Sequence, residues 1–168
     1  MLIKTFLTPL NYLLLIWVIL NLQWLATTDT SHLSVETTFV GSTPCSKNIK
    51  PIRSMDTSDC EFAKWTIVIS DVETGKGHFT LHCVYGMTLP GTTQVRNGGA
   101  VVDLKGTWIT EKGMAGFPNA QVIRLDPDGG TDPIRLVKLN ERLLHMLDEE
   151  KKLMIGNPAW SYTFSMTK

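Results

Sequence analysis

The chain has 168 residues, of which 43% are hydrophobic and 19% are charged. Because domains typically run to about 100–150 residues, this length allows one sizeable core but is short for two. The 16 Lys and Arg residues balance the 16 Asp and Glu residues, so no net field attracts phosphate backbones or an anionic membrane surface. This balance argues against nucleic acid as a partner.

The N-terminal segment, residues 1–28, is typical of an export leader. Lys4 precedes an apolar run whose compact centre, residues 12–20, has the length of a signal-peptide core. Small residues follow at positions 26–28, and we expect cleavage near them. The alternative is an uncleaved anchor, because residues 9–25 are just long enough to cross a thin bilayer. The chain would then touch the membrane only through this leader.

Three cysteines, Cys45, Cys60 and Cys83, predict one disulfide and one remaining thiol in an exported chain. The stretch between Cys45 and Cys60 is polar. A crosslink there would reduce the entropy of the unfolded chain and thereby stabilise the fold by about 3 kcal/mol. We favour this pair, although the sequence alone does not choose it. Cys83 lies within an apolar alternation, which is typical of a small buried hydrophobe. Export places the protein in the periplasm or outside the cell, and association with the outer membrane is compatible with this location.

Residues 29–59 read as a polar extended segment and loop, with a short extended patch at 33–40. The regular pattern begins after Cys60, where apolar and polar side chains alternate with a period of two and turn residues separate the runs. Residues 142–152 are the one stretch where a helix competes, and we expect two strands there instead. The expected strands are 62–69, 78–85, 100–110, 120–125, 133–139, 143–147, 152–155 and 160–166.

About eight short strands separated by polar turns predict an all-β domain over residues 60–168. A meander of this length would expose its edges unless the sheet closed on itself. We therefore expect a small antiparallel up-and-down barrel of lipocalin-like form behind the N-terminal leader.

Aromatic residues recur on the expected strands and are the candidate lining of a pocket for an apolar ligand. The same side chains can equally fill the barrel, because an interior enclosed by about eight strands is narrow enough for side chains to plug. The five candidates are Trp65, Phe79, Tyr85, Trp108 and Trp160.

Metal binding is a weaker hypothesis. His78 and His82 lie four positions apart on one strand, and such positions are about 13 Å apart, too far for one ion. Cys83 points away from His82, while Met87, His145 and Met146 would have to approach them in space. The identity of any metal stays open at this point, and solvated histidines with core methionines are the favoured interpretation.

Catalysis has no support in the motifs. The acidic residues from Asp126 to Asp132 can hold Ca²⁺ weakly, but turn formation accounts for them better. No nucleophile elbow, phosphate-binding glycine loop or zinc-binding helix motif occurs in the sequence. We therefore expect no enzyme activity and no cofactor.

Five motifs in order along the chain resemble the N-terminal barrel of the NlpE-like copper-resistance lipoprotein family. They are Phe39 to Cys45, Cys60-Glu61, Gly106-Thr107-Trp108, His145 to Asp148 and Trp160 to Phe164. The C-terminal stretch Gly156 to Thr163 is also similar to that of envelope proteins of Bacteroidetes. The resemblance implies a cell-envelope barrel with a role in envelope stress or copper homeostasis. The chain departs from the family in two features, since the family's cysteines are spaced Cys-x-x-Cys and its lipid-bearing Cys is missing here.

Three functions follow as expectations. The first is a non-enzymatic envelope barrel that binds a small apolar ligand or an envelope protein. The second is a purely structural or protein-interaction barrel with a filled core. The third is a copper-binding protein.

Overall fold

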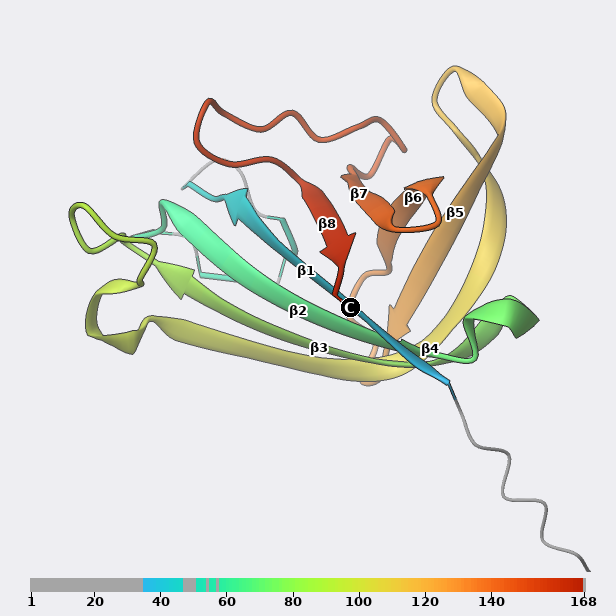
Figure 1. Cartoon of the computed structure of the whole chain (residues 1–168), viewed down its shortest axis with the longest axis horizontal. Helices are drawn as coiled ribbons and strands as arrows, with labels where there is room; N and C mark the ends of the chain where they lie inside the picture. The colour runs from blue at the N-terminus through green and yellow to red at the C-terminus, as the bar shows by residue number, and fades with distance from the viewer. Residues whose placement is uncertain (1–34, 47–50, 54, 57, 168) are drawn as a thin grey trace, which may run out of the picture. The chain divides into compact units, whose positions relative to one another are not determined.

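The computed structural model describes residues 35–46, 51–53, 55–56 and 58–167. Its eight strands are all antiparallel to their neighbours and close into a barrel in chain order (Figure 1). This confirms the expected all-β barrel. The expected leader, residues 1–28, lies outside the described residues. No helix among the described residues is long and apolar enough to span a membrane.

Among the described residues, the connections between the strands contain two short 3-10 helices. In chain order, the elements are β1 (Glu36–Pro44), β2 (Phe62–Ser70), η2 (Val72–Thr74), β3 (Lys76–Gly86), η3 (Arg96–Gly98), β4 (Ala100–Met114), β5 (Phe117–Pro127), β6 (Ile134–Asn140), β7 (Leu143–Leu147) and β8 (Thr163–Met166). The expected strands between residues 62 and 147 correspond to β2–β7. The turn from β4 to β5 is shorter than expected, because both strands extend into the glycine-containing stretch 113–119.

The barrel begins earlier than the sequence indicates. We expected regular strands only after residue 60, yet β1 pairs with β2 along its whole length and with β8 at three positions. The boundary between a polar segment 29–59 and a barrel 60–168 is therefore wrong. Gly41 is part of the reason, because a Cβ there would stand 2.6 Å from Cδ1 of Phe164. The glycine that looks like a loop residue lets the Phe164 ring lie directly on β1.

The strand expected at 152–155 does not form, and the strand expected at 160–166 begins only at Thr163. The first of these segments makes a single bridge, between Leu153 and Leu147. The carboxylate of Asp148 accepts hydrogen bonds from the backbone N–H groups of Glu150 and Lys152, which closes a turn before any ladder can extend. The barrel thus has the expected number of strands because β1 takes the place of the missing one.

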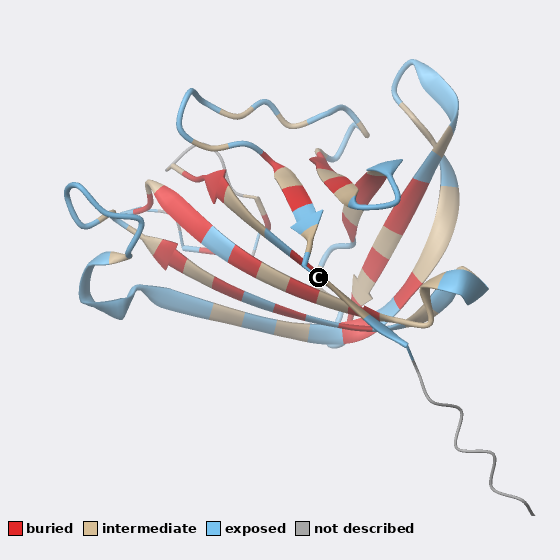
Figure 2. Ribbon diagram, in the orientation of Figure 1, coloured by how far each residue is buried: buried red, intermediate tan, exposed pale blue. Residues whose placement is uncertain are grey.

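The core follows the predicted alternation, and buried residues alternate with more exposed ones along β2 and β3 (Figure 2). The inward side chains form one apolar cluster. It includes Trp65, Ile67 and Ile69 of β2, Phe79, Leu81, Cys83 and Tyr85 of β3, Trp108 of β4, Leu125 of β5, Leu136 of β6, Leu144 and Met146 of β7, and Phe164 of β8.

Buried polar atoms within this core find partners in the protein itself. The indole Nε1 of Trp65 donates to Oγ1 of Thr43 at 2.9 Å, and Nε1 of Trp108 donates to the carbonyl of Ser70 at 2.9 Å. The hydroxyl of Tyr162 donates to the carbonyl of Pro44 at 3.0 Å, and burial raises the pKa of Tyr162 to about 12. Such pairing removes the free-energy penalty of unsatisfied buried donors.

A second apolar cluster lies apart from the main core. Its buried members are Val122, Val137 and Leu147.

The carboxylate of Glu111, on β4 opposite Val122, contacts Arg135 at 3.1 Å and Lys151 at 3.2 Å. Burial raises the pKa of Glu111, but these two cations outweigh it and the pKa lies below its usual value. The charge network thereby ties β4 to β6 and to the turn after β7.

Gly106 marks the tightest approach between strands and provides a test of the fold. A Cβ there would stand 2.1 Å from the carbonyl oxygen of Asp126, which belongs to the backbone and cannot move aside cheaply. We expect Gly106→Val to reduce the free energy of unfolding by about 3 kcal/mol or more. Urea denaturation measures this change. The neighbouring Thr107 is exposed, so Thr107→Val should stay within about 0.5 kcal/mol of wild type. Equal stability of the two variants would contradict the assigned packing.

Candidate functional site

The two ends of the barrel differ in the length of their connections. In an up-and-down barrel, alternate connections lie at the same end. One end, here named the loop end, carries connections 45–61, 87–99, 128–133 and 148–162. The opposite end, the turn end, carries the short connections 71–75, 115–116 and 141–142. Binding residues concentrate on long loops that a rigid scaffold positions, so the loop end is the better candidate for a binding site.

A disulfide closes the first long connection. Cys45 and Cys60 are bonded, with 5.4 Å between their Cα atoms, which confirms the predicted pair. Between them, Ile52 and Met55 are buried and belong to the core cluster. We name the described residues 51–53 and 55–56 the cap, because their apolar side chains pack on the core at this end of the barrel.

The cap also carries a cation that reaches two other connections. Nε of Arg53 lies 3.1 Å from Oδ2 of Asp132, in the turn between β5 and β6. Its NH2 group lies 2.7 Å from Oε1 of Glu149, in the connection between β7 and β8. These three side chains are 59–73% exposed. Exposed pairs of this kind contribute only about 0–1 kcal/mol each to stability.

A groove lies between the cap and these two connections. Acidic side chains outnumber basic ones along it, and apolar residues lie between them. Its lining consists of Pro51, Ile52, Arg53, Asp132, Pro133, Ile134, Arg135, Leu147, Asp148, Glu149, Glu150 and Met154. We name this feature the loop-end groove and regard it as the candidate binding site.

The next long connection, 87–99, is held by Glu61. Its carboxylate accepts hydrogen bonds from the hydroxyl of Thr88 at 2.5 Å and from the backbone N–H of Thr88 at 3.2 Å. These hydrogen bonds lower the pKa of Glu61 below its usual value. On the cap side, the hydroxyl of Tyr85 accepts a hydrogen bond from the backbone N–H of Asp56 at 3.2 Å. Both contacts fix loops of the same end to the start of β2 and the end of β3.

The five aromatic residues predicted to line a pocket do not all come together. Trp65, Phe79, Tyr85 and Trp108 are buried in the core cluster. Trp160 is half-buried and packs instead on Phe62, with 5.0 Å between ring centroids. The structure therefore places four of the five inside the barrel, as packing residues with close protein neighbours.

The residues considered as copper ligands lie on both faces of the sheet. Cys83 and Met146 are buried in the core, whereas His78 and His82 are exposed on the outer face of β3. Nδ1 of His82 contacts Asp103 at 2.7 Å. Both ring nitrogens of His145 lie 2.9 Å from protein oxygen atoms, those of the Thr163 hydroxyl and of a backbone carbonyl. Within the part of the chain that the structure describes, no group of three or more His, Cys, Asp or Glu side chains could hold a metal ion.

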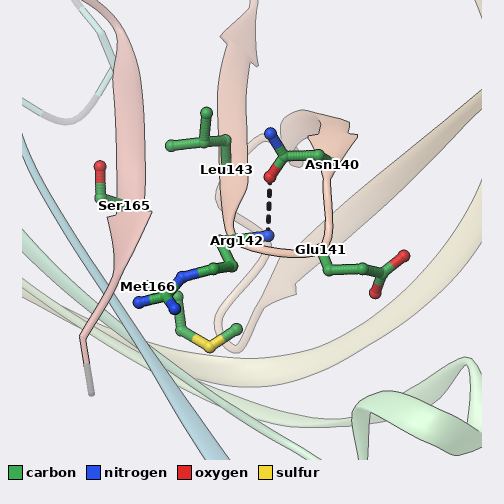
Figure 3. A pocket seen from close by; sticks show the side chains of 6 residues that line it. All are labelled: Asn140, Glu141, Arg142, Leu143, Ser165 and Met166. Atoms are coloured by element: carbon green, nitrogen blue, oxygen red, sulfur yellow. Dashed lines mark hydrogen bonds between the residues drawn. The ribbon is translucent and has the colours of Figure 1, made fainter.

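A second recess lies at the turn end, beside the hairpin between β6 and β7 (Figure 3). The side-chain oxygen of Asn140 accepts a hydrogen bond from the backbone N–H of Arg142 at 2.8 Å, and the Arg142 side chain lies beside Met166. Glu141 pairs with Lys138 at 2.6 Å. One hairpin and the end of β8 make up the whole recess, so it offers less converging chemistry than the loop-end groove.

The residues of the loop-end groove were missed as a site because no sequence spacing joins them. Arg53, Asp132 and Glu149 belong to three connections, and each has an ordinary interpretation as a loop or turn residue. Only the closure of the barrel brings these connections to one end. The signal available in the sequence was the concentration of charge in the connections, and it carries no information about which charges meet.

Fold and site together define a disulfide-bonded antiparallel β-barrel with a packed core and a charged groove at one end. No protein-family model, curated protein or solved structure matches the chain. No matched relative therefore contributes to the functional assignment, which depends on the sequence and the geometry of this chain.

The disulfide provides a stability test. Because it closes a loop with a sequence separation of 15, we expect the double variant Cys45→Ser/Cys60→Ser to lose about 3 kcal/mol of unfolding free energy. Urea denaturation of the oxidised protein measures the loss. Cys83→Ala serves as the control, because it keeps the disulfide and removes a single sulfur atom. A double variant as stable as the control would contradict a structural role for the disulfide.

Glu61 predicts a pH dependence. Because its pKa is lowered on folding, its contribution to stability is complete above the pKa of an unfolded Glu, about 4.3, and disappears as the pH falls through the lower folded value. We expect the melting temperature of Glu61→Gln to lie below that of wild type at neutral pH. The gap should close in acid. A gap that stays constant from neutral to strongly acidic pH would contradict the contact with Thr88.

Proposed function

We propose that this protein is an exported, non-catalytic binding module of the cell envelope, which recognises its partner at the loop end and holds no ligand inside the barrel. The observation that carries the proposal is the occupation of the interior by the protein's own side chains. Trp65, Trp108 and Tyr162 are at most 2% exposed, and their polar atoms already have protein partners. An internal ligand would have to displace this packing, at a cost of several kcal/mol.

Export is supported by the cysteine chemistry. The Cys45–Cys60 disulfide fits an oxidising compartment such as the periplasm or the cell exterior, where such bonds form and persist. The leader-like composition of residues 1–28 points the same way. The resemblance to the NlpE-like family agrees with an envelope location, and it adds envelope stress as a setting in which a recognition module would act.

The absence of catalysis in this proposal is supported by the nucleophiles present. Cys83 is the one cysteine outside the disulfide, and burial raises the pKa of its thiol, which disfavours the reactive thiolate. The ring of His145 is held by protein oxygen atoms on both sides. These contacts also favour recognition over copper handling, because soft-metal ligation would require His145 to leave its two oxygen partners and Cys83 to leave the packed core.

Tryptophan fluorescence tests the filled interior. We expect palmitate and a hydrophobic dye to leave the emission of the wild-type protein unchanged, because Trp65 and Trp108 are packed against protein atoms. Trp65→Ala is the positive control, since it creates an apolar cavity of the kind that admits small apolar ligands. A saturable one-to-one shift of emission in the wild type would contradict the proposal and favour a carrier with an internal ligand.

A further inference from the structure

The charges of the loop-end groove are unequal. Two carboxylates, those of Asp132 and Glu149, share the single guanidinium of Arg53. Arg135 also lines the groove, but it contacts Glu111 at 3.1 Å. The rim around Arg53 therefore carries more negative than positive charge, although the chain as a whole has no net charge.

Apolar surface lies between these charges. Pro133 is exposed, and Pro51 and Met154 are half-buried. Beneath them, Ile52 and Ile134 are buried and give the groove a firm base. A partner that fits this surface needs a cation to meet the carboxylates and aliphatic atoms to cover the prolines and the methionine.

Arg53 occupies the groove as a side chain of the protein itself and shows which chemistry the rim accepts. A guanidinium lies between two carboxylates that come from different connections. Because all three groups are well exposed to solvent, exchanging this guanidinium for another cation costs little free energy. The cap would keep its place during such an exchange, since Ile52 and Met55 remain buried and the disulfide remains closed.

On the basis of the proposed function, we infer that the loop-end groove binds a segment of a partner protein in which arginine or lysine alternates with apolar residues, in competition with Arg53. The cationic side chains contact Asp132 and Glu149, and the apolar ones cover Pro133 and Met154. A multivalent metal ion fits the groove less well, because Asp132 and Glu149 are already paired with Arg53 and no metal-holding cluster occurs among the described residues.

Peptide binding to matched variants tests the inference. The probe is a fluorescein-labelled peptide of alternating Arg and Leu, titrated with the oxidised mature protein and followed by fluorescence anisotropy. A peptide with Glu in place of Arg is the charge-reversed control. We expect the peptide with Arg to bind, with an affinity that falls as the salt concentration increases. We expect the peptide with Glu not to bind.

The variants separate the groove from general electrostatic attraction. Glu149→Gln should weaken binding about threefold, and Arg53→Ala should strengthen it about threefold by removing the internal competitor. Glu73→Gln and Lys76→Ala make the same changes of charge at the turn end, and we expect them to leave the dissociation constant unchanged. The double variant Arg53→Ala/Glu149→Gln should lose the gain made by Arg53→Ala alone. Melting temperatures verify that each variant is folded.

Two results would overturn the inference: no binding of the Arg peptide, or variants of the groove that change the dissociation constant no more than their turn-end controls. Either result would leave the fluorescence test of the filled interior untouched. Conversely, a saturable shift of tryptophan emission in the wild type would show a ligand inside the barrel. The peptide result would then be judged separately.

Discussion

Closure of the sheet between β1 and β8 is the constraint on which the rest of the structure depends. β8 makes only three residue pairs with β1 and three with β7, so the backbone ladder there is short. Side-chain packing completes the closure between β1 and β8, here called the seam. Phe164 lies on Gly41 and meets Trp65 edge to face at 6.2 Å, and the hydroxyl of Tyr162 reaches the carbonyl of Pro44. Without these contacts the sheet would be open, and the large inward side chains would face water along one side.

Barrel closure also explains why the charged groove exists. Strands that run up and down place every second connection at the same end, so connections far apart in the chain become neighbours. Three of these connections meet at the loop end: the cap, the turn between β5 and β6, and the connection between β7 and β8. Arg53 joins them through its contacts with Asp132 and Glu149. The disulfide follows directly after β1, so the same seam that closes the barrel also fixes where the cap begins.

Alternation in the sequence was sufficient for the fold class, for β2–β7 and for the inward orientation of Trp65 and Cys83, because a period of two depends only on local side-chain direction. Alternation failed to predict the segments whose structure is determined by tertiary packing. Residues 41–44 read as a loop, yet Gly41 receives an aromatic ring and Thr43 accepts the indole N–H of Trp65. Residues 152–155 read as a strand, yet they lack a continuous partner. The groove could not be predicted, since its charges meet only through barrel closure.

The groups that stabilise the fold differ from those to which the proposal assigns recognition, so a change of charge in the groove leaves the stabilising groups unchanged. The cap is held by buried Ile52 and Met55 and by a covalent bond, all of which act whether or not Arg53 is paired. The contacts of Arg53 itself are exposed and contribute little to the free energy of unfolding. Charge on the rim can therefore be removed, reversed or engaged by a partner while the core stays intact. In a barrel whose interior is packed with its own side chains, an exposed and exchangeable ion pair is the more accessible place for binding to occur.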